Sequence, residues 1–140
     1  MTSQTRSIHV DQFLPKPPEV VWRALTEPER LARWWAAGDV APVVGHRFTL
    51  DMGGWGQVPC TVTVVEPHER FAHTFAEDTM GWTLTWRLVA EGTGTRLFLE
   101  HSGFDLDDPR HANAYENMSR GWAGAVLPKL ARTLESVSAP

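Results

Sequence analysis

The amino-acid sequence is poor in several features on which whole classes of protein depend. It has one cysteine, Cys60, in 140 residues, which excludes an internal disulfide framework and a cysteine-based zinc site. Its longest purely apolar runs span only a few residues, far short of the roughly 20 that a membrane-spanning helix needs. The N-terminal residues lack the apolar stretch of a secretory signal, so we expect a cytoplasmic protein.

Positive charge and catalytic motifs are also scarce. Thirteen Lys and Arg stand against seventeen Asp and Glu, a formal net charge of -4, and no basic stripe of the kind that binds nucleic acid is present. The six histidines include no HxH or HxxxH pair, and the chain has no GxSxG, GxGxxG or P-loop motif. We therefore expect no metal, no cofactor and no nucleic-acid partner, and no motif specifies a reaction.

What the sequence has in excess is tryptophan. Seven Trp, with 42% hydrophobic and 21% charged residues, indicate a globular chain with a sizeable core, and we expect residues 1–140 to form a single domain. Large aromatic rings either fill a core or line an apolar cavity, and composition does not decide between the two. The basic residues are mostly Arg, which together with ten Pro is typical of a GC-rich bacterium.

The N-terminal part predicts one strand followed by two short helices. The prolines that follow Leu14 end a strand over 7–14 and can open the first turn of a helix. Thr26 and Glu29 fit a capping box, which predicts a second short helix. The apolar face of that helix would consist of Leu31, Trp34 and Trp35.

Between residues 45 and 101 apolar side chains recur at every second position, which predicts about five half-buried antiparallel strands. Gly92-Thr93-Gly94 predicts a hairpin turn between the last two of them. The clearest alternating series is Trp82, Leu84, Trp86 and Leu88.

The C-terminal part predicts a long amphipathic helix. Asp108 can cap it, with Pro109 at the first helical position. Pro128 should kink it, because proline has no N–H to give the carbonyl of Gly124. The apolar stripe steps by three or four residues through Tyr115, Met118, Trp122, Val126, Leu130, Leu134 and Val137.

Five stretches carry a resemblance to a known family, and the resemblance covers about 7–135. They are Val20–Thr26, Leu31–Trp35, Glu66–Phe71, His101–Phe104 and Gly121–Trp122. In this order they resemble the SRPBCC (START-like, helix-grip) superfamily, and within it the branch similar to the C-terminal domain of the activator of heat shock protein ATPase.

The resemblance implies an α+β helix-grip fold. A curved antiparallel sheet would wrap around the long C-terminal helix, with two short helices after the first strand and an apolar cavity between sheet and helix. The superfamily includes lipid carriers, hormone receptors, polyketide cyclases and hydrolase-like enzymes, so the fold does not fix the function. We expect no counterpart of the additional N-terminal domain of the eukaryotic activators, an expectation that counts against a chaperone-stimulating role.

The inward-facing aromatic residues are the candidate ligand-binding site. Each ring alone is more simply a core residue, but the cavity that the resemblance implies favours a shared apolar site. Gly121 and Gly124 would thin the helix there and allow something to approach closely. The candidate residues are Trp34, Trp35, Phe48, His73, Phe75, Trp82, Trp86, His101, Met118 and Trp122.

Two of these candidates, His73 and His101, are polar residues on otherwise apolar faces. A neutral imidazole can orient a ligand carbonyl or hydroxyl group, or act as a general base. The alternative is a buried histidine that is bonded only to its neighbours. The family often has His at the position of His101 and an aromatic residue at that of His73, so His73 is the stronger candidate for a ligand contact.

Three functions follow from these patterns, in order of preference. The first is a protein that binds an apolar or aromatic small molecule or lipid. The second is a cavity enzyme of the polyketide cyclase or hydratase type, which would use His73, His101 or a nearby acid. The third is a chaperone-associated protein with a protein partner. Since no catalytic motif is present, the sequence favours binding over catalysis.

Overall fold

A computed structural model describes residues 5–136 and confirms the predicted order of elements, from one strand and two short helices to a run of strands and a long C-terminal helix. Val137, the last residue of the predicted apolar stripe, lies outside the described residues. None of the described helices is long and apolar enough to cross a membrane.

The elements are β1 (Thr5–Leu14), α1 (Pro18–Thr26), α2 (Pro28–Leu31), β2 (Arg47–Asp51), the 3-10 turn η1 (Gly53–Trp55), β3 (Gln57–Glu66), β4 (Arg70–Phe75), β5 (Trp82–Glu91), β6 (Gly94–Asp105), α3 (Pro109–Gly121), the π-helical turn η2 (Trp122–Val126) and α4 (Leu127–Glu135).

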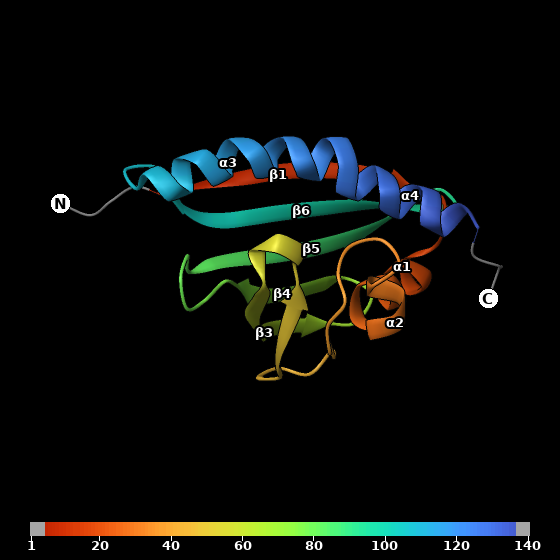
Figure 1. Ribbon diagram of the computed structural model, residues 1–140. Helices are drawn as coiled ribbons and strands as arrows, with labels where there is room; N and C mark the ends of the chain where they lie inside the picture. The colour runs from red at the N-terminus through yellow and green to blue at the C-terminus, as the bar shows by residue number, and fades with distance from the viewer. Residues whose placement is uncertain (1–4, 137–140) are drawn as a thin grey trace.

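The six strands form one antiparallel sheet in the order β1-β6-β5-β4-β3-β2. The first strand therefore pairs with the last, and Ile8 lies opposite His101. The long helix formed by α3, η2 and α4 runs along β1 and β6, while α1 and α2 lie at one end of the sheet (Figure 1). The sheet curves around this helix, and the core lies between them. This is the α+β helix-grip fold that the sequence predicted.

Alternation along the strands follows the predicted two-residue period. In β5 the four apolar residues from Trp82 to Leu88 are buried, while the threonines and Arg87 between them are less buried or exposed. In β3 the alternation breaks after Val62, because the pairing of β3 with β4 shifts there by one residue. A bulge of this kind adds a residue to one strand, and Val64, which continues the alternating series of Val58, Cys60 and Val62, is only half-buried.

The predicted capping box at Thr26 and Glu29 is wrong. The Thr26 hydroxyl donates to the carbonyl oxygen of Trp22 at 2.8 Å, one turn back in α1, and so is not free to cap α2. Glu27 caps α2 without a side-chain hydrogen bond. The predicted second helix is also shorter than expected: α2 ends at Leu31, and the two tryptophans that follow lie in the turns after it.

Pro128 changes the long helix in a way the sequence did not predict. Just before Pro128 the helix widens into the π-helical turn η2, where the Leu127 N–H donates to the carbonyl of Trp122, five residues back. This extra residue per turn moves the buried stripe along by one position. Leu127 is buried where Val126 was expected, and Val126 is half-buried. The buried residues of the stripe are Trp122, Leu127, Leu130 and Leu134.

The helix glycines do not serve the close approach that we expected. A Cβ atom built on Gly121 or on Gly124 meets no other atom within 4 Å, so both positions face open space. The backbone of Gly121 is ordinary α-helix, at φ -65 and ψ -46. A close approach to the sheet or to a bound molecule therefore does not explain these two residues.

We predict that Gly121→Ala stabilises the protein. Alanine is about 1 kcal/mol more favourable than glycine inside a helix, and the added methyl group meets no obstruction. Urea unfolding should give an increase of about 0.5–1 kcal/mol in the free energy of unfolding. A decrease would mean that another part of the protein approaches the helix at this point.

Candidate functional site

The ten candidate residues are positioned by elements from the whole chain. Trp34 and Trp35 follow α2, Phe48 lies on β2, His73 and Phe75 lie on β4, Trp82 and Trp86 lie on β5, His101 lies on β6, Met118 lies on α3 and Trp122 begins η2. The nine rings among them form a continuous set of ring contacts, and Met118 packs against the core at its edge. The structure therefore brings the nine rings together, and their role as a ligand site stays a prediction.

These rings fill the space in which we expected a cavity. Trp35 lies at their centre, in contact with five other rings. Its ring centroid is 5.3 Å from that of Trp122 and 5.7 Å from that of Phe75, which are ordinary packing distances. The open space in this region lies instead at the surface, between α3 and the turn before β3.

His73 is fully engaged by its neighbours. The indole N–H of Trp86 donates to its Nε2 at 3.2 Å, which places the ring proton on Nδ1, 2.8 Å from the carbonyl oxygen of Thr74. Burial lowers the pKa of His73 to about 4, although the bond to Thr74 opposes the shift. His73 is therefore neutral at physiological pH and has no free ring nitrogen for a ligand. The sequence analysis had ranked His73 above His101 as a candidate for a ligand contact, and the structure does not support that order.

His101 has one free ring nitrogen. The indole N–H of Trp122 donates to Nδ1 of His101 at 3.0 Å, so the proton of the neutral ring lies on Nε2. Burial, and next the nearby His73, lower the pKa of His101 to about 3. Nε2 is buried and has no hydrogen-bond partner, and leaving a buried donor unpaired costs about 1–3 kcal/mol. His101 is thus the candidate with unused binding capacity.

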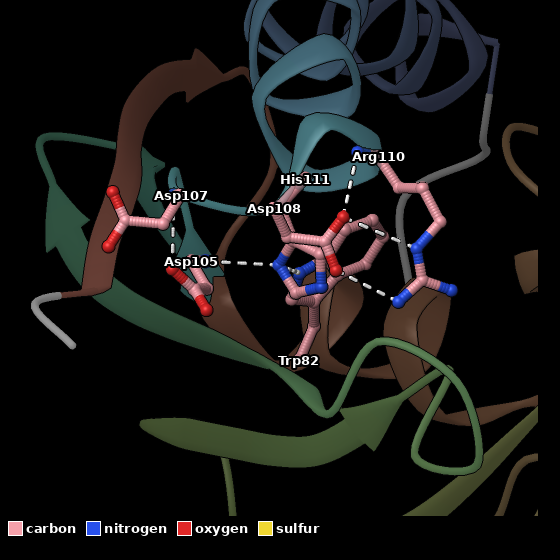
Figure 2. A network of polar contacts seen from close by, with 6 residues as sticks. All are labelled: Trp82, Asp105, Asp107, Asp108, Arg110 and His111. Carbon is pink, nitrogen blue, oxygen red and sulfur yellow. Dashed lines mark hydrogen bonds and ion pairs between the residues drawn. The ribbon is translucent and has the colours of Figure 1, made fainter. Parts of the chain in front are cut away.

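A third tryptophan–histidine pair joins the sheet to the start of α3. Nδ1 of His111 accepts from the indole N–H of Trp82 at 3.4 Å and from the backbone N–H of Asp105 at 3.0 Å (Figure 2). Beside it, Asp108 caps α3 by accepting from the backbone N–H of Arg110 and also holds that guanidinium. The Arg110 guanidinium lowers the pKa of the Asp108 carboxyl group. The predicted cap is confirmed, and it places Arg110 at the rim of the open space.

That open space is a groove of about 440 Å³ along α3, which we call the mouth groove. Trp55, from η1, forms its floor and is 49% exposed. Below the floor, the Trp55 ring stacks on Trp82 at 5.9 Å and contacts Phe75 at 6.3 Å. A neighbouring hollow of about 270 Å³ shares Trp55, Met80 and Arg110 with it. The walls of the mouth groove are Met80, Arg110, Asn113, Ala114, Asn117 and Met118.

The sequence analysis did not identify most of the residues that line the mouth groove. Met118 is the one candidate residue that lines it. Trp55 follows no strand or helix period, because it lies in a turn between glycines, and periodicity identifies only residues on the faces of regular elements. The spacing of Arg110, Ala114, Asn117 and Met118 on one helix face could have indicated the groove wall.

The outer face of the sheet has a hollow of a different kind. It measures about 410 Å³ and is rich in charged side chains. The Arg87 guanidinium covers the Phe98 ring at 4.3 Å from its centroid. Nearby, Arg96 contacts Asp11 and Glu91. This hollow therefore presents mainly charged side chains, whereas the mouth groove presents exposed ring surface.

Nucleophilic and metal chemistry find little support in the site. Burial, and next the nearby Glu77, raise the pKa of the Cys60 thiol to about 12, so Cys60 is not a thiolate at neutral pH. Among residues 5–136, no group of three or more His, Cys, Asp or Glu lies in an arrangement that could hold a metal ion.

Sequence and structure comparisons agree with this fold. The fold and the elements that enclose the aromatic core define a member of the SRPBCC superfamily. Residues 15–135 match the family model described as Activator of Hsp90 ATPase homolog 1-like protein, and the chain belongs to that family. A comparison with curated protein sequences found no match.

Solved structures of similar proteins cover nearly the whole chain. Protein MLL2253 from Mesorhizobium loti is 33% identical, with a TM-score of 0.82, over 96% of this chain and 100% of that one. Protein BH1534 from Bacillus halodurans is also 33% identical, with a TM-score of 0.81, over 96% of this chain and 99% of that one. DynU16 is 26% identical, with a TM-score of 0.74, over 93% of this chain but 47% of its own.

The buried histidines predict that the protein loses stability in mild acid. In the unfolded chain a histidine titrates near pH 6.5, whereas the pKa values of folded His73 and His101 are about 4 and about 3. Below pH 6.5 the unfolded state therefore binds more protons than the folded state. The free energy of unfolding should fall as the pH drops from about 6.5 towards 4, by up to about 1.4 kcal/mol per pH unit for each histidine.

Urea unfolding of the wild type and of His73→Phe at several pH values checks this expectation. The variant lacks one of the two titrating groups, so its stability should change with pH about half as steeply over the same range. Equal stability of the wild type at about pH 7 and about pH 5 would contradict the neutral, buried state of both histidines.

Proposed function

We propose that this protein binds a small molecule with an apolar, ring-bearing frame at the mouth groove. The observation that supports this most directly is the half-exposed Trp55, whose ring lies on the aromatic core and forms the floor of a groove of about 440 Å³. A large exposed ring at the base of a concave surface provides area for stacking and for apolar burial.

The chemistry of the groove fits such a ligand. Trp55, Met80, Ala114 and Met118 provide an apolar floor and walls, and methionine side chains adapt to ligands of different shape. Arg110, Asn113 and Asn117 add a few polar groups at the rim. An apolar interior with a small number of polar groups, in a volume of a few hundred Å³, is typical of small-molecule sites.

Binding is favoured over catalysis. A general base needs a ring nitrogen that is free and within reach of the proton it removes. Both nitrogens of His73 already have partners, and Nδ1 of His101 accepts from Trp122. The remaining nitrogen of His101, Nε2, carries the proton of the neutral ring because Nδ1 accepts from Trp122, so it is a hydrogen-bond donor and not a base. The cyclase or hydratase alternative needs a second polar group that converges on the same point.

The relatives are consistent with a small-molecule function but do not specify one. DynU16 is described as a putative protein in the dynemicin biosynthetic locus, which links one relative to small-molecule synthesis. The family description refers to activators of a chaperone ATPase. A chaperone-associated role rests on that description alone, whereas the binding role also has the mouth groove in its support.

A fluorescence titration with anilinonaphthalene sulfonate tests the proposal. The dye has an apolar ring frame and an anionic group that can approach Arg110, and it becomes fluorescent when buried. Asn117→Trp places a large side chain in the mouth groove, whereas Glu116→Trp places the same ring on an adjacent, exposed position of α3 that does not line it. We expect saturable binding by the wild type and at least a tenfold loss of affinity in Asn117→Trp, because a blocked contact surface removes more than about 1.4 kcal/mol.

The Glu116→Trp control should bind as the wild type does. Thermal unfolding of both variants establishes that the protein remains folded. Equal affinity in the two variants would place the dye elsewhere on the protein, and absence of saturable binding by the wild type would remove the support for a binding function at this groove.

A further inference from the structure

Nε2 of His101 is the one buried side-chain polar atom without a hydrogen-bond partner among residues 5–136. Because Nδ1 accepts from Trp122, Nε2 carries the proton of the neutral ring and can only donate. Buried polar groups in native proteins nearly always have a partner, and an exception points to a bound group or to a function.

The surroundings of His101 do not supply the missing acceptor. Its ring packs against Phe104 at 4.5 Å, Trp82 at 4.9 Å and Phe75 at 5.9 Å, measured between ring centroids. The side chain itself has no solvent exposure. An acceptor must therefore come from a molecule that enters the aromatic core.

The mouth groove is the side from which such a molecule can approach. Two of the rings that contact His101, Phe75 and Trp82, are the rings that Trp55 covers at the floor of the groove. One layer of rings thus separates the floor from His101. On the helix side, Met118 lines the groove one turn before Trp122, the hydrogen-bond partner of His101.

The cover formed by Trp55 lies on a segment with unusual backbone freedom. Gly53 and Gly56 have φ values of 66 and 86, and no atom lies within 4 Å of a Cβ built on either residue. Glycine tolerates these values and their rotation without steric penalty. Trp122 begins η2, and π-helical turns are frequent at functional sites. Both sides of the route to His101 therefore depart from regular structure.

We propose that the ligand carries a hydrogen-bond acceptor, a carbonyl or ether oxygen on an aromatic frame, and that this oxygen accepts a hydrogen bond from His101 Nε2–H. The frame takes the place of Trp55 at the mouth groove, and Trp55 turns outward on its glycine-flanked segment. Phe75 and Trp82, which separate the floor of the groove from His101, must move apart so that the oxygen reaches Nε2. This inference rests on the proposed function, because it assigns a ligand class to the same site.

A matched pair of probes tests the inference. Acetylnaphthalene and isopropylnaphthalene have nearly the same shape, and only the first has a carbonyl oxygen. Calorimetric titration of the wild type should give about five- to tenfold tighter binding of the ketone, the effect of one net hydrogen bond. In His101→Phe the preference for the ketone over the hydrocarbon should disappear, because no donor remains for the carbonyl oxygen.

A second measurement does not depend on the folding of a variant. The carbonyl stretching band of acetylnaphthalene, labelled with carbon-13 and bound to the wild-type protein, should move to lower frequency than in an apolar solvent, because Nε2–H donates to the oxygen. An unshifted band would overturn the inference even if His101→Phe proved too unstable to study.

The remaining outcomes separate this inference from the proposed function. If both probes bind equally well to the wild type, the groove binds ligands but His101 does not select an acceptor, and the inference is wrong. If neither binds, the proposed function fails with it. A crystal structure of the ketone complex with only a water on Nε2 would also overturn the assignment.

Discussion

Hydrogen bonds from three buried tryptophans to three buried histidines connect the layers of this protein. Trp86 and His73 join neighbouring strands β5 and β4, Trp122 and His101 join η2 to β6, and Trp82 and His111 join β5 to α3. Two of the three pairs thus link the sheet to the long helix. A tryptophan that is fully buried needs an acceptor for its indole N–H, and a neutral histidine supplies one without placing a charge in the core.

The tryptophan–histidine pairs also limit what the site can do chemically. Each bond fixes which nitrogen carries the proton, so His73 has no capacity left and His101 keeps one donor. Because the rings fill the space beneath the helix, a ligand must enter from the mouth groove and displace a side chain. Trp55 is the ring whose exposure and glycine-flanked backbone make displacement easiest.

Much of this architecture could be predicted from the sequence, since a two-residue or four-residue period directly reports which face is buried. The period of β5 and the cap at Asp108 were correct for that reason. The π-helical turn before Pro128 could not be predicted, because a proline inside a helix has several structural solutions and the packing of Trp122 and Leu127 selects one. The Thr26 hydroxyl donates within α1 and does not cap α2. Both hydrogen bonds are local, and the sequence pattern does not show which of them forms.

For the candidate site, the sequence identified which rings face inward but not whether they leave a space between them. That depends on side-chain packing between β4, β5, η2 and the turn after α2, which are distant in the chain. Trp55, at the floor of the mouth groove, could not be predicted as a site residue because it lies outside every periodic segment. The ranking of His73 and His101 depended on hydrogen-bond partners, and these are known only once the fold brings the tryptophans beside them.

The central claim is that His73 and His101 are neutral rings, each fixed in one protonation pattern by a tryptophan. A long-range proton–nitrogen correlation spectrum of the histidine side chains, recorded on nitrogen-15-labelled protein at about pH 5.5, tests it most directly, since an ordinary histidine is mostly protonated there. The account predicts that His73 appears as the neutral ring with its proton on Nδ1 and His101 as the neutral ring with its proton on Nε2. Signals of protonated imidazolium for either residue, or the opposite pattern in either ring, would contradict it.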